Sequence, residues 1–197
     1  MKKLISIFTL AIMTIVGLTA CGSKDGGDVS GREIHKDGSV TAKIVREFDE
    51  TLYSVDGLKS MMDEEIRSYN FDHAGDMIQA GEVSCTEGIL TCVIEYSSAD
   101  DYAEFNTRRF VIESFDDAMA SDLVKVSVKS VKDMDQADLS TLDNTGTLYV
   151  LITDETGQVT FPGKVRYVSD GVEVVSGKQI NVTDNMDGLA YIIYENK

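Results

Sequence analysis

Residues 54–69 read SVDGLKSMMDEEIRSY and predict the principal helix of the fold. Apolar side chains recur there every three or four residues, the spacing that places them on one face of an α-helix. They are Val55, Leu58, Met62, Ile66 and Tyr69. Ser54 is the expected N-cap, because its hydroxyl can accept a hydrogen bond from a backbone N–H of the first turn. We therefore expect an amphipathic helix over about residues 55–70, with Asp63 and Glu64 facing solvent.

Strand patterns lie on both sides of this helix. Between residues 40 and 48 apolar and polar side chains alternate, as they do in a half-buried strand. Residues 82–96 have the pattern of a β-hairpin with Glu87 and Gly88 at its bend. Further apolar or alternating segments are residues 124–128, 148–152, 159–168, 172–182 and 189–194. The continuous apolar runs among them suit interior strands that are covered on both faces.

Two serines predict short helices between these strands. Ser98 and Ser114 are each followed, three residues later, by an aspartate, which is the pattern of a capping box. The first of these helices should end at about Asn106. Together the segments predict an α+β fold, with a largely antiparallel β-sheet, one main amphipathic helix on one face, and one or two short helices.

The first 21 residues have the features of an export signal. Lys2 and Lys3 form a basic start, and residues 4–16 are an apolar run without a charge. The run is shorter than the about 20 residues that span a bilayer, but it fits the h-region of a secretory signal peptide. Residues 18–21, Leu-Thr-Ala-Cys, resemble the lipobox of bacterial lipoproteins. That resemblance implies cleavage before Cys21 and two acyl chains on it, which suffice for stable anchoring at the extracytoplasmic face of the cell membrane.

The segment after the lipobox has the composition of a linker. Residues 22–39 contain five glycines and three serines and no apolar periodicity, so we expect a flexible tether. The expected organisation is then a signal peptide over residues 1–20, a lipidated cysteine and tether over residues 21–39, and a single α+β domain over residues 40–197.

The charge of the chain argues against two classes of partner. The sequence has 34 Asp and Glu against 18 Lys and Arg. Removal of the expected signal peptide would take away Lys2 and Lys3 and would leave 16 basic residues against 34 acidic ones. Such an excess of negative charge repels nucleic acid and anionic lipid headgroups. Solubility at a crowded surface is the simpler explanation for it.

The sequence contains few residues arranged for catalysis. A hydrolase needs a nucleophile with a base, usually histidine, and the two histidines are His35, within the expected tether, and His73, in a polar break. The sequence contains no nucleophile-elbow, zinc-protease or nucleotide-binding motif. We therefore expect no catalytic residue and no cofactor.

Two acidic clusters and a set of aromatic residues suggest binding sites, but structural explanations are simpler. Residues 133–138 and 183–188 offer oxygen ligands, yet neither fits a calcium-binding EF-hand loop, and solvated turns explain both without a metal. The aromatic residues occur at strand spacing, which favours packing in a core or on a sheet face over a sugar- or peptide-binding surface. They are Tyr149, Phe161, Tyr167, Tyr191 and Tyr194.

Cys85 and Cys92 form a possible disulfide, because an exported compartment permits pairing. In a hairpin both thiols point inward in either of two registers. A loop centred on Gly88 and Ile89 places the cysteines directly opposite each other. A loop centred on Glu87 and Gly88 pairs Cys85 with Leu90 and leaves the sulfurs diagonal. The alternative is that both are buried, reduced cysteines that act as small hydrophobes.

These observations favour a membrane-anchored, surface-exposed lipoprotein with a non-enzymatic domain that binds an unknown envelope or extracellular protein or ligand. One alternative is a capture protein that delivers a small solute to a transporter, although residues 40–197 are few for the usual two-lobed clamp. A cell-wall hydrolase, with a site assembled from scattered carboxylates, is the other alternative.

Overall fold

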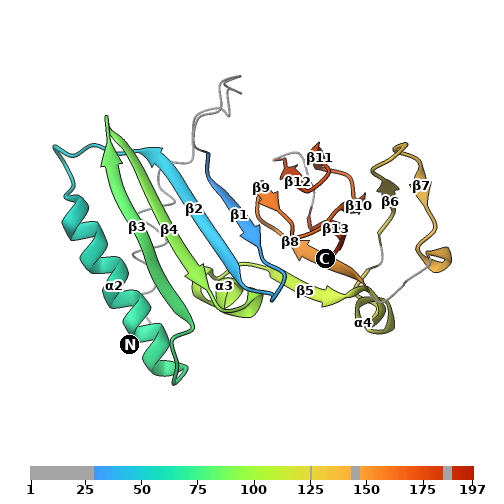
Figure 1. Cartoon of the computed structure of the whole chain (residues 1–197), viewed down its shortest axis with the longest axis horizontal. Helices are drawn as coiled ribbons and strands as arrows, with labels where there is room; N and C mark the ends of the chain where they lie inside the picture. The colour runs from blue at the N-terminus through green and yellow to red at the C-terminus, as the bar shows by residue number, and fades with distance from the viewer. Residues whose placement is uncertain (1–28, 125, 143–146, 184–187) are drawn as a thin grey trace. The chain divides into compact units, whose positions relative to one another are not determined.

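The computed structural model of the chain describes residues 29–124, 126–142, 147–183 and 188–197. The expected signal peptide, the lipobox and Cys21 lie outside these residues. The described part has thirteen strands and three α-helices, and its strand pairing is mostly antiparallel, so the α+β class predicted from the sequence is confirmed (Figure 1). The chain divides into two compact units, which are described in turn.

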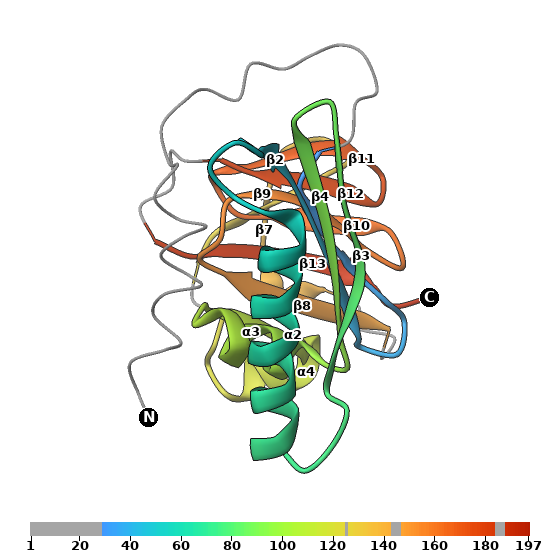
Figure 2. The ribbon, with the colours of Figure 1, turned by 90° about the vertical axis from the view of Figure 1, so that its left-hand side faces the viewer.

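The first unit consists mainly of residues 43–95 and is built around one helix and a hairpin. The helix is α2 (Val55–Asp72), and the hairpin strands are β3 (Ile78–Thr86) and β4 (Ile89–Tyr96). The later residues of β2 (Val40–Glu47) complete the strand order β2-β4-β3. Helix α2 lies along the hairpin, as both ribbon views show (Figures 1 and 2).

The predicted apolar stripe holds α2 in place. Met62 and Ile66 are buried, and the other three members of the stripe are half-buried. Ser54 caps the helix as expected, since its hydroxyl accepts a hydrogen bond from the backbone N–H of Gly57 at 3.2 Å. At the other end the Asn70 side chain donates to the backbone carbonyl of Ile78 and accepts from its N–H, at 2.8 and 2.9 Å. These contacts tie the end of α2 to the start of β3.

The turn of the hairpin selects one of the two expected registers. Glu87 and Gly88 have φ values of +53° and +76°, the pair of positive values that a two-residue type I′ turn requires. Strand β3 therefore ends at Thr86 and β4 begins at Ile89. This two-residue turn places Cys85 opposite Leu90. The expected inward face of β4 is confirmed, because its alternate residues from Leu90 to Tyr96 are buried.

The second unit comprises residues 31–42 and 96–197 and contains an antiparallel six-stranded sheet. Its strand order is β5 (Phe110–Ser114), β8 (Leu148–Thr153), β13 (Ala190–Glu195), β10 (Val165–Val168), β6 (Val128–Ser130) and β7 (Gln136–Ala137). Strands β8 and β13 are interior, and almost every residue in them is buried, as their continuous apolar runs predict. Phe115 and Ala118 of α4 (Phe115–Ala120) pack on one face of this sheet.

The second unit has a further set of neighbouring strands. Their order is β11 (Val172–Ser176), β12 (Gln179–Val182), β9 (Gly157–Thr160), β1 (Gly31–Ile34) and the first residues of β2. The two predicted short helices are confirmed as α3 (Ala99–Asn106) and α4, while residues 139–141 form a single 3₁₀ turn. Ser98 and Ser114 cap the two helices by accepting hydrogen bonds from the N–H groups of Asp101 and Asp117.

The expected tether is wrong for residues 31–34, which form β1. This strand pairs in parallel with β9, where Arg32 lies opposite Val159. Ile34 is 2% exposed, so the strand also contributes to a core. A tight turn, in which Gly38 donates to the carbonyl of His35, then leads into β2. The glycine- and serine-rich composition of these residues is typical of a linker. The strand forms because β9, far along the chain, provides its hydrogen-bonding partner.

Candidate functional site

A structured loop precedes α2 and, together with the first residues of that helix, lines an open hollow in the first unit. The Asp49 carboxylate accepts hydrogen bonds from the N–H and hydroxyl of Thr51 at 2.9 and 2.6 Å. The Asp49 carbonyl accepts from the N–H groups of Leu52 and Tyr53, both at 3.1 Å. The bond from the Thr51 hydroxyl is the main reason that the pKa of Asp49 is lowered. The loop is therefore held by an ionised side chain at neutral pH.

The same loop is fastened to the turn of the β3–β4 hairpin. The N–H of Phe48 donates to the carbonyl of Gly88 at 2.8 Å, and the rings of Phe48 and Tyr53 lie 6.2 Å apart. The Glu50 side chain accepts a hydrogen bond from the thiol of Cys85, which is the first cause of the raised pKa of that thiol. Contacts at both ends thus fix the backbone that carries residues 50–53.

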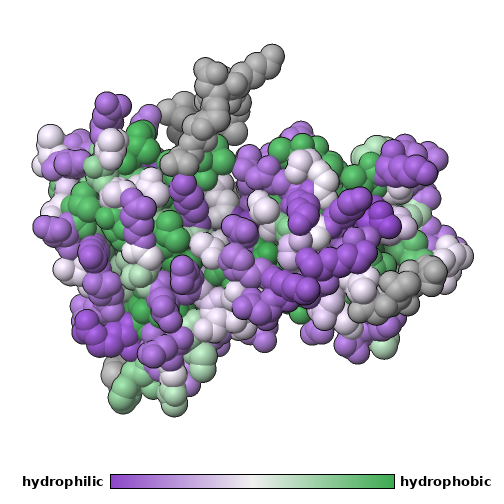
Figure 3. All heavy atoms as spheres, in the orientation of Figure 1, coloured by the Kyte–Doolittle hydropathy of each residue, from purple (hydrophilic) through white to green (hydrophobic). Residues whose placement is uncertain are grey.

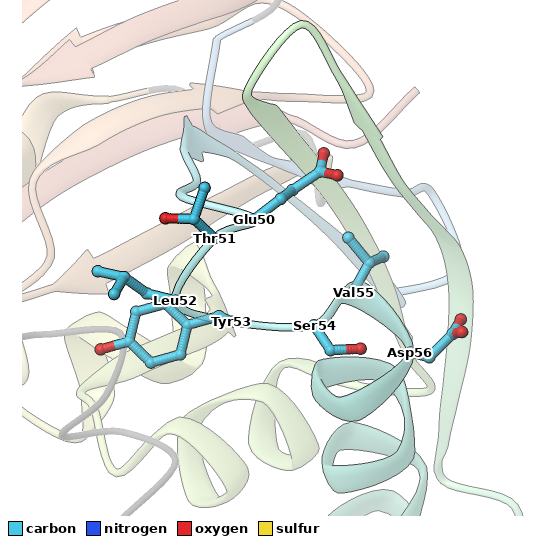
Figure 4. Close-up of a pocket in the computed structure, with 7 residues that line it drawn as sticks. All are labelled: Glu50, Thr51, Leu52, Tyr53, Ser54, Val55 and Asp56. Carbon is cyan, nitrogen blue, oxygen red and sulfur yellow. The ribbon is translucent and has the colours of Figure 1, made fainter.

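The hollow is lined by residues 50–56 and has a volume of about 490 Å³ (Figure 4). We call it the 50–56 hollow. Leu52 and Tyr53 are 71% and 65% exposed, and their side chains lie together on the opposite side of the loop from the carboxylates of Glu50 and Asp56 (Figure 4). The hollow therefore combines an exposed apolar pair with two negative charges.

Apolar side chains also reach the surface elsewhere in the first unit. Hydrophobic and hydrophilic atoms are interspersed across its visible face (Figure 3). Phe71, near the other end of α2, is 83% exposed, and Met61 and Ile89 are 46% and 41% exposed. Isolated exposed apolar residues are normal on proteins, so exposure alone does not mark a site. The 50–56 hollow differs because its two apolar residues are adjacent, lie on a hydrogen-bonded loop and share the lining with two carboxylates.

The second unit contains a largely buried polar network centred on Glu155. Arg32 Nη1 lies 3.4 Å from Glu155 Oε2, and the Tyr102 hydroxyl donates to the same oxygen at 2.6 Å. Arg32 Nη2 donates to the carbonyl of Thr156 at 2.6 Å, and Arg108 Nε lies 3.9 Å from Glu155 Oε1. Burial is the main cause of the raised pKa of Tyr102, so its hydroxyl stays protonated and acts as a donor. The network joins β1, α3 and the residues before β9.

The charged side chains of this network compensate one another, which is typical of a structural role. Only 10% of the Arg32 side chain and 17% of the Glu155 side chain are exposed. The Nε of Arg32 is buried and has no hydrogen-bond partner in the described part of the chain. Because the guanidinium already faces the carboxylate of Glu155, its charge is compensated inside the unit. We therefore assign this network to the stability of the fold.

The structure places Cys85 and Cys92 in different surroundings and holds both as free thiols. Cys85 is half-buried beside Glu50, while Cys92 is buried with its Sγ 3.4 Å from the Sδ of Met62. Burial raises the pKa of Cys92 to about 11. The observed register is the one that leaves the two cysteines diagonal across the hairpin.

The other residues that the sequence suggested for binding or catalysis lie apart. His35 Nε2 lies 2.8 Å from the Thr41 hydroxyl, in the second unit. His73 follows α2 in the first unit, where it stacks on Tyr69 at 3.9 Å between ring centroids. In residues 133–138 the Asp133 carboxylate accepts from the backbone N–H of Asp135, as in a solvated turn. Within the described ranges, no group of three metal-ligating side chains occurs.

The second acidic cluster and the aromatic set have different outcomes. Residues 184–187 of the cluster at 183–188 lie outside the described residues. The aromatic residues pack rather than form a binding face, as the strand spacing favoured: Phe161, Tyr191 and Tyr194 are buried, with Phe161 and Tyr194 4.6 Å apart between ring centroids. Tyr149 and Tyr167 are half-buried in the same unit.

The 50–56 hollow is not predicted from the amino-acid sequence. Leu52 and Tyr53 belong to neither the strand pattern before them nor the helical stripe after them, so periodicity gives no signal at this position. The available sign is an adjacent aliphatic and aromatic residue between polar residues, directly before a helix N-cap. Aspartate followed two residues later by threonine is a further sign, because it permits the side-chain turn that orders the loop.

Comparisons with known proteins give no match: no protein-family model matches the chain, and no curated protein or solved structure matches it significantly. In the part of the chain that the structure covers, no helix is long and apolar enough to cross a membrane.

Proposed function

We propose that this protein is a bacterial lipoprotein, anchored through Cys21 at the extracytoplasmic face of the cell membrane, whose folded part binds a protein partner without catalysis. The anchoring part rests on the sequence of residues 1–21: a basic start, an uncharged apolar run and a lipobox occur in the required order. Two acyl chains on one cysteine give stable membrane attachment.

The binding part is supported chiefly by the exposed apolar pair at the 50–56 hollow. Leu52 and Tyr53 are presented by a loop whose backbone is held by Asp49 and by the hairpin turn. Tyrosine is enriched at the energetically important positions of protein interfaces. A preformed loop also lowers the entropy lost on binding, since fewer groups have to be ordered.

The anchor is tested by replacing Cys21 with alanine. The processed wild-type protein should enter the detergent phase on phase separation, and mass spectrometry should find acyl chains on Cys21. The Cys21→Ala chain should remain unprocessed or become soluble. A wild-type protein that stays in the aqueous phase, or that carries an unmodified N-terminus elsewhere, would contradict lipidation.

The binding role is tested by site-specific photo-crosslinking in the native membranes. A photoreactive amino acid at position 52 should give a discrete crosslinked product with another protein. The same residue at position 175 is the matched control, because Val175 is 52% exposed on the second unit. Equal products at both positions, or none at position 52, would argue against a binding role for the hollow.

A further inference from the structure

We infer that the 50–56 hollow recognises a basic, apolar segment of its protein partner, in which lysine or arginine alternates with aliphatic or aromatic residues. This inference rests on the proposed binding function and specifies the chemistry of the partner.

The apolar half of the hollow provides the contact area. Leu52 and Tyr53 leave most of their side-chain surface in water and lie side by side (Figure 4). Covering such side chains is favourable in proportion to the apolar area removed from water. A partner must therefore bring an aliphatic or aromatic side chain to this pair.

The charged half of the hollow sets the sign of the partner. Glu50 and Asp56 line it, Asp49 lies directly beside it, and residues 49–56 contain no lysine or arginine. The surrounding chain adds to this field, because residues 43–95 contain 12 acidic and four basic residues. An acidic segment would be repelled, whereas lysine or arginine would be attracted, and such complementarity governs the choice of partner and the rate of association.

The geometry of the loop favours one short segment that presents both kinds of side chain. The apolar pair and the carboxylates of Glu50 and Asp56 lie on opposite sides of the same loop, within seven consecutive lining residues (Figure 4). Successive side chains of an extended segment point in opposite directions. An alternating basic and apolar sequence can therefore direct one side chain to each side of the loop.

The experiment measures binding of labelled peptides to the purified full chain by fluorescence anisotropy. The first peptide is short and alternates lysine with leucine and phenylalanine. In the second peptide glutamate replaces lysine, and in the third serine replaces the apolar residues. The first peptide should bind most tightly, and its affinity should fall as salt rises, because surface charges more than about 8 Å apart are screened at physiological ionic strength.

Variants locate the binding on the structure. Leu52→Ser should weaken binding of the first peptide by about fivefold or more, as expected for a central apolar contact. Glu50→Gln and Asp56→Asn should each weaken it by about two- to fivefold, the range for exposed charge pairs. Far-UV circular dichroism and thermal unfolding of each variant verify that the first unit is still folded.

Two matched control substitutions lie on α2, outside the hollow. Phe71→Ser removes an even more exposed apolar side chain, and Glu64→Gln removes an exposed carboxylate, and neither residue lines the hollow. Neither control should change the affinity. If Phe71→Ser weakens binding as much as Leu52→Ser does, the peptide binds apolar surface in general, and the inference fails.

Other outcomes identify a different occupant and also overturn the inference. Equal binding of the glutamate or serine peptide would remove the expected partner chemistry. Sedimentation of the chain as a dimer that Leu52→Ser abolishes would assign the surface to a second copy, and loss of vesicle binding in that variant would assign it to lipid. If position 52 crosslinks to another protein while the peptides bind equally, the binding function stands and only the partner chemistry is wrong. If position 52 gives no crosslink, the binding function itself is refuted.

Discussion

The guanidinium of Arg32 faces the carboxylate of Glu155, with Nη1 3.4 Å from Oε2, and the Tyr102 hydroxyl reaches the same oxygen. Arg32 belongs to β1, Tyr102 to α3 and Glu155 to the residues before β9, so these contacts join segments that are far apart along the chain. Because both charged side chains are mostly buried, each depends on the other for compensation of its charge.

We expect Glu155→Ala to lower the free energy of unfolding by about 3 to 5 kcal/mol, because it leaves the buried charge of Arg32 without a carboxylate beside it. Tyr102→Phe removes one hydrogen bond to a charged group and should cost about 1.5 to 3 kcal/mol. Urea-induced unfolding measures both changes. The double variant Arg32→Met, Glu155→Leu should be more stable than Glu155→Ala, and a double variant that is less stable would contradict this account.

Removal of β1 should destabilise the protein although its sequence resembles a linker. A chain that begins at residue 35 loses the pairing of β1 with β9 and the buried side chain of Ile34. We expect its unfolding midpoint to fall by roughly 5 to 20 °C, as follows from the loss of a buried aliphatic residue in a chain of this size. A chain that begins at residue 29 keeps β1 and is the matched control. Equal midpoints for the two chains would mean that β1 contributes nothing.

The sequence predicts local structure well where one residue pattern determines it. Ser54, Ser98 and Ser114 mark the starts of all three described helices, because an N-cap depends on a side chain and on backbone groups only a few residues away. The interior strands β8 and β13 are equally evident as apolar runs. In these segments local preference and burial favour the same structure.

The sequence is less informative where long-range pairing decides the structure. Residues 159–168 look like one apolar segment. In the structure β9 ends at Thr160 and β10 begins at Val165, and the two strands belong to different sheets. Pairing with distant strands determines where each ends. The strand expected over residues 124–128 is likewise displaced to Val128–Ser130, where β10 provides a partner. The 50–56 hollow could not be predicted for a different reason, because its exposed apolar residues, Leu52 and Tyr53, follow neither a strand nor a helix periodicity.

The buried stripe of α2 predicts a sharp contrast between the two faces of that helix. Met62→Ala and Ile66→Ala should each cost about 2 to 5 kcal/mol, because both residues are buried against the hairpin. Leu58→Ala should cost less, since Leu58 is only half-buried. Glu64→Ala, on the exposed face, should change the free energy of unfolding by less than about 0.5 kcal/mol. Similar losses at positions 62 and 64, measured in urea, would contradict the observed orientation.

Gly163 is expected to tolerate no side chain. A Cβ atom there would lie 2.1 Å from the backbone carbonyl oxygen of Glu195, so the connection between β9 and β10 would have to move away from β13. Gly163→Ala should therefore cost about 1 to 3 kcal/mol, as overpacking does elsewhere. Gly177→Ala is the matched control, because nothing lies within 4 Å of the added Cβ. Thermal unfolding of the two variants should separate them clearly, and equal midpoints would disprove the steric conflict.

The two hairpin cysteines should be free thiols that react slowly in the folded protein and quickly after unfolding. Burial raises the pKa of Cys92 to about 11, from an ordinary value of 9.0, so its thiolate fraction at pH 8 falls by about a hundredfold. Alkylation with iodoacetamide should be slowed accordingly in the folded protein and should become fast in denaturant.

The same shift in pKa predicts how stability varies with pH. Above about pH 9 the unfolded chain loses the Cys92 proton while the folded chain retains it, so the free energy of unfolding should fall as the pH rises from 9 towards 11. Cys92→Ala should show a smaller fall over this range.

Intact mass after alkylation in denaturant tests the redox state of both residues directly. We expect Cys85 and Cys92 to be alkylated without prior reduction, because the structure holds them as separate thiols on diagonal positions of the hairpin. A product that takes up two alkyl groups only after reduction would demonstrate a Cys85–Cys92 disulfide. It would require the hairpin to twist from the observed arrangement, because neighbours on a diagonal lie about 7 to 8 Å apart and a disulfide needs Cβ atoms about 3.5 to 4.5 Å apart.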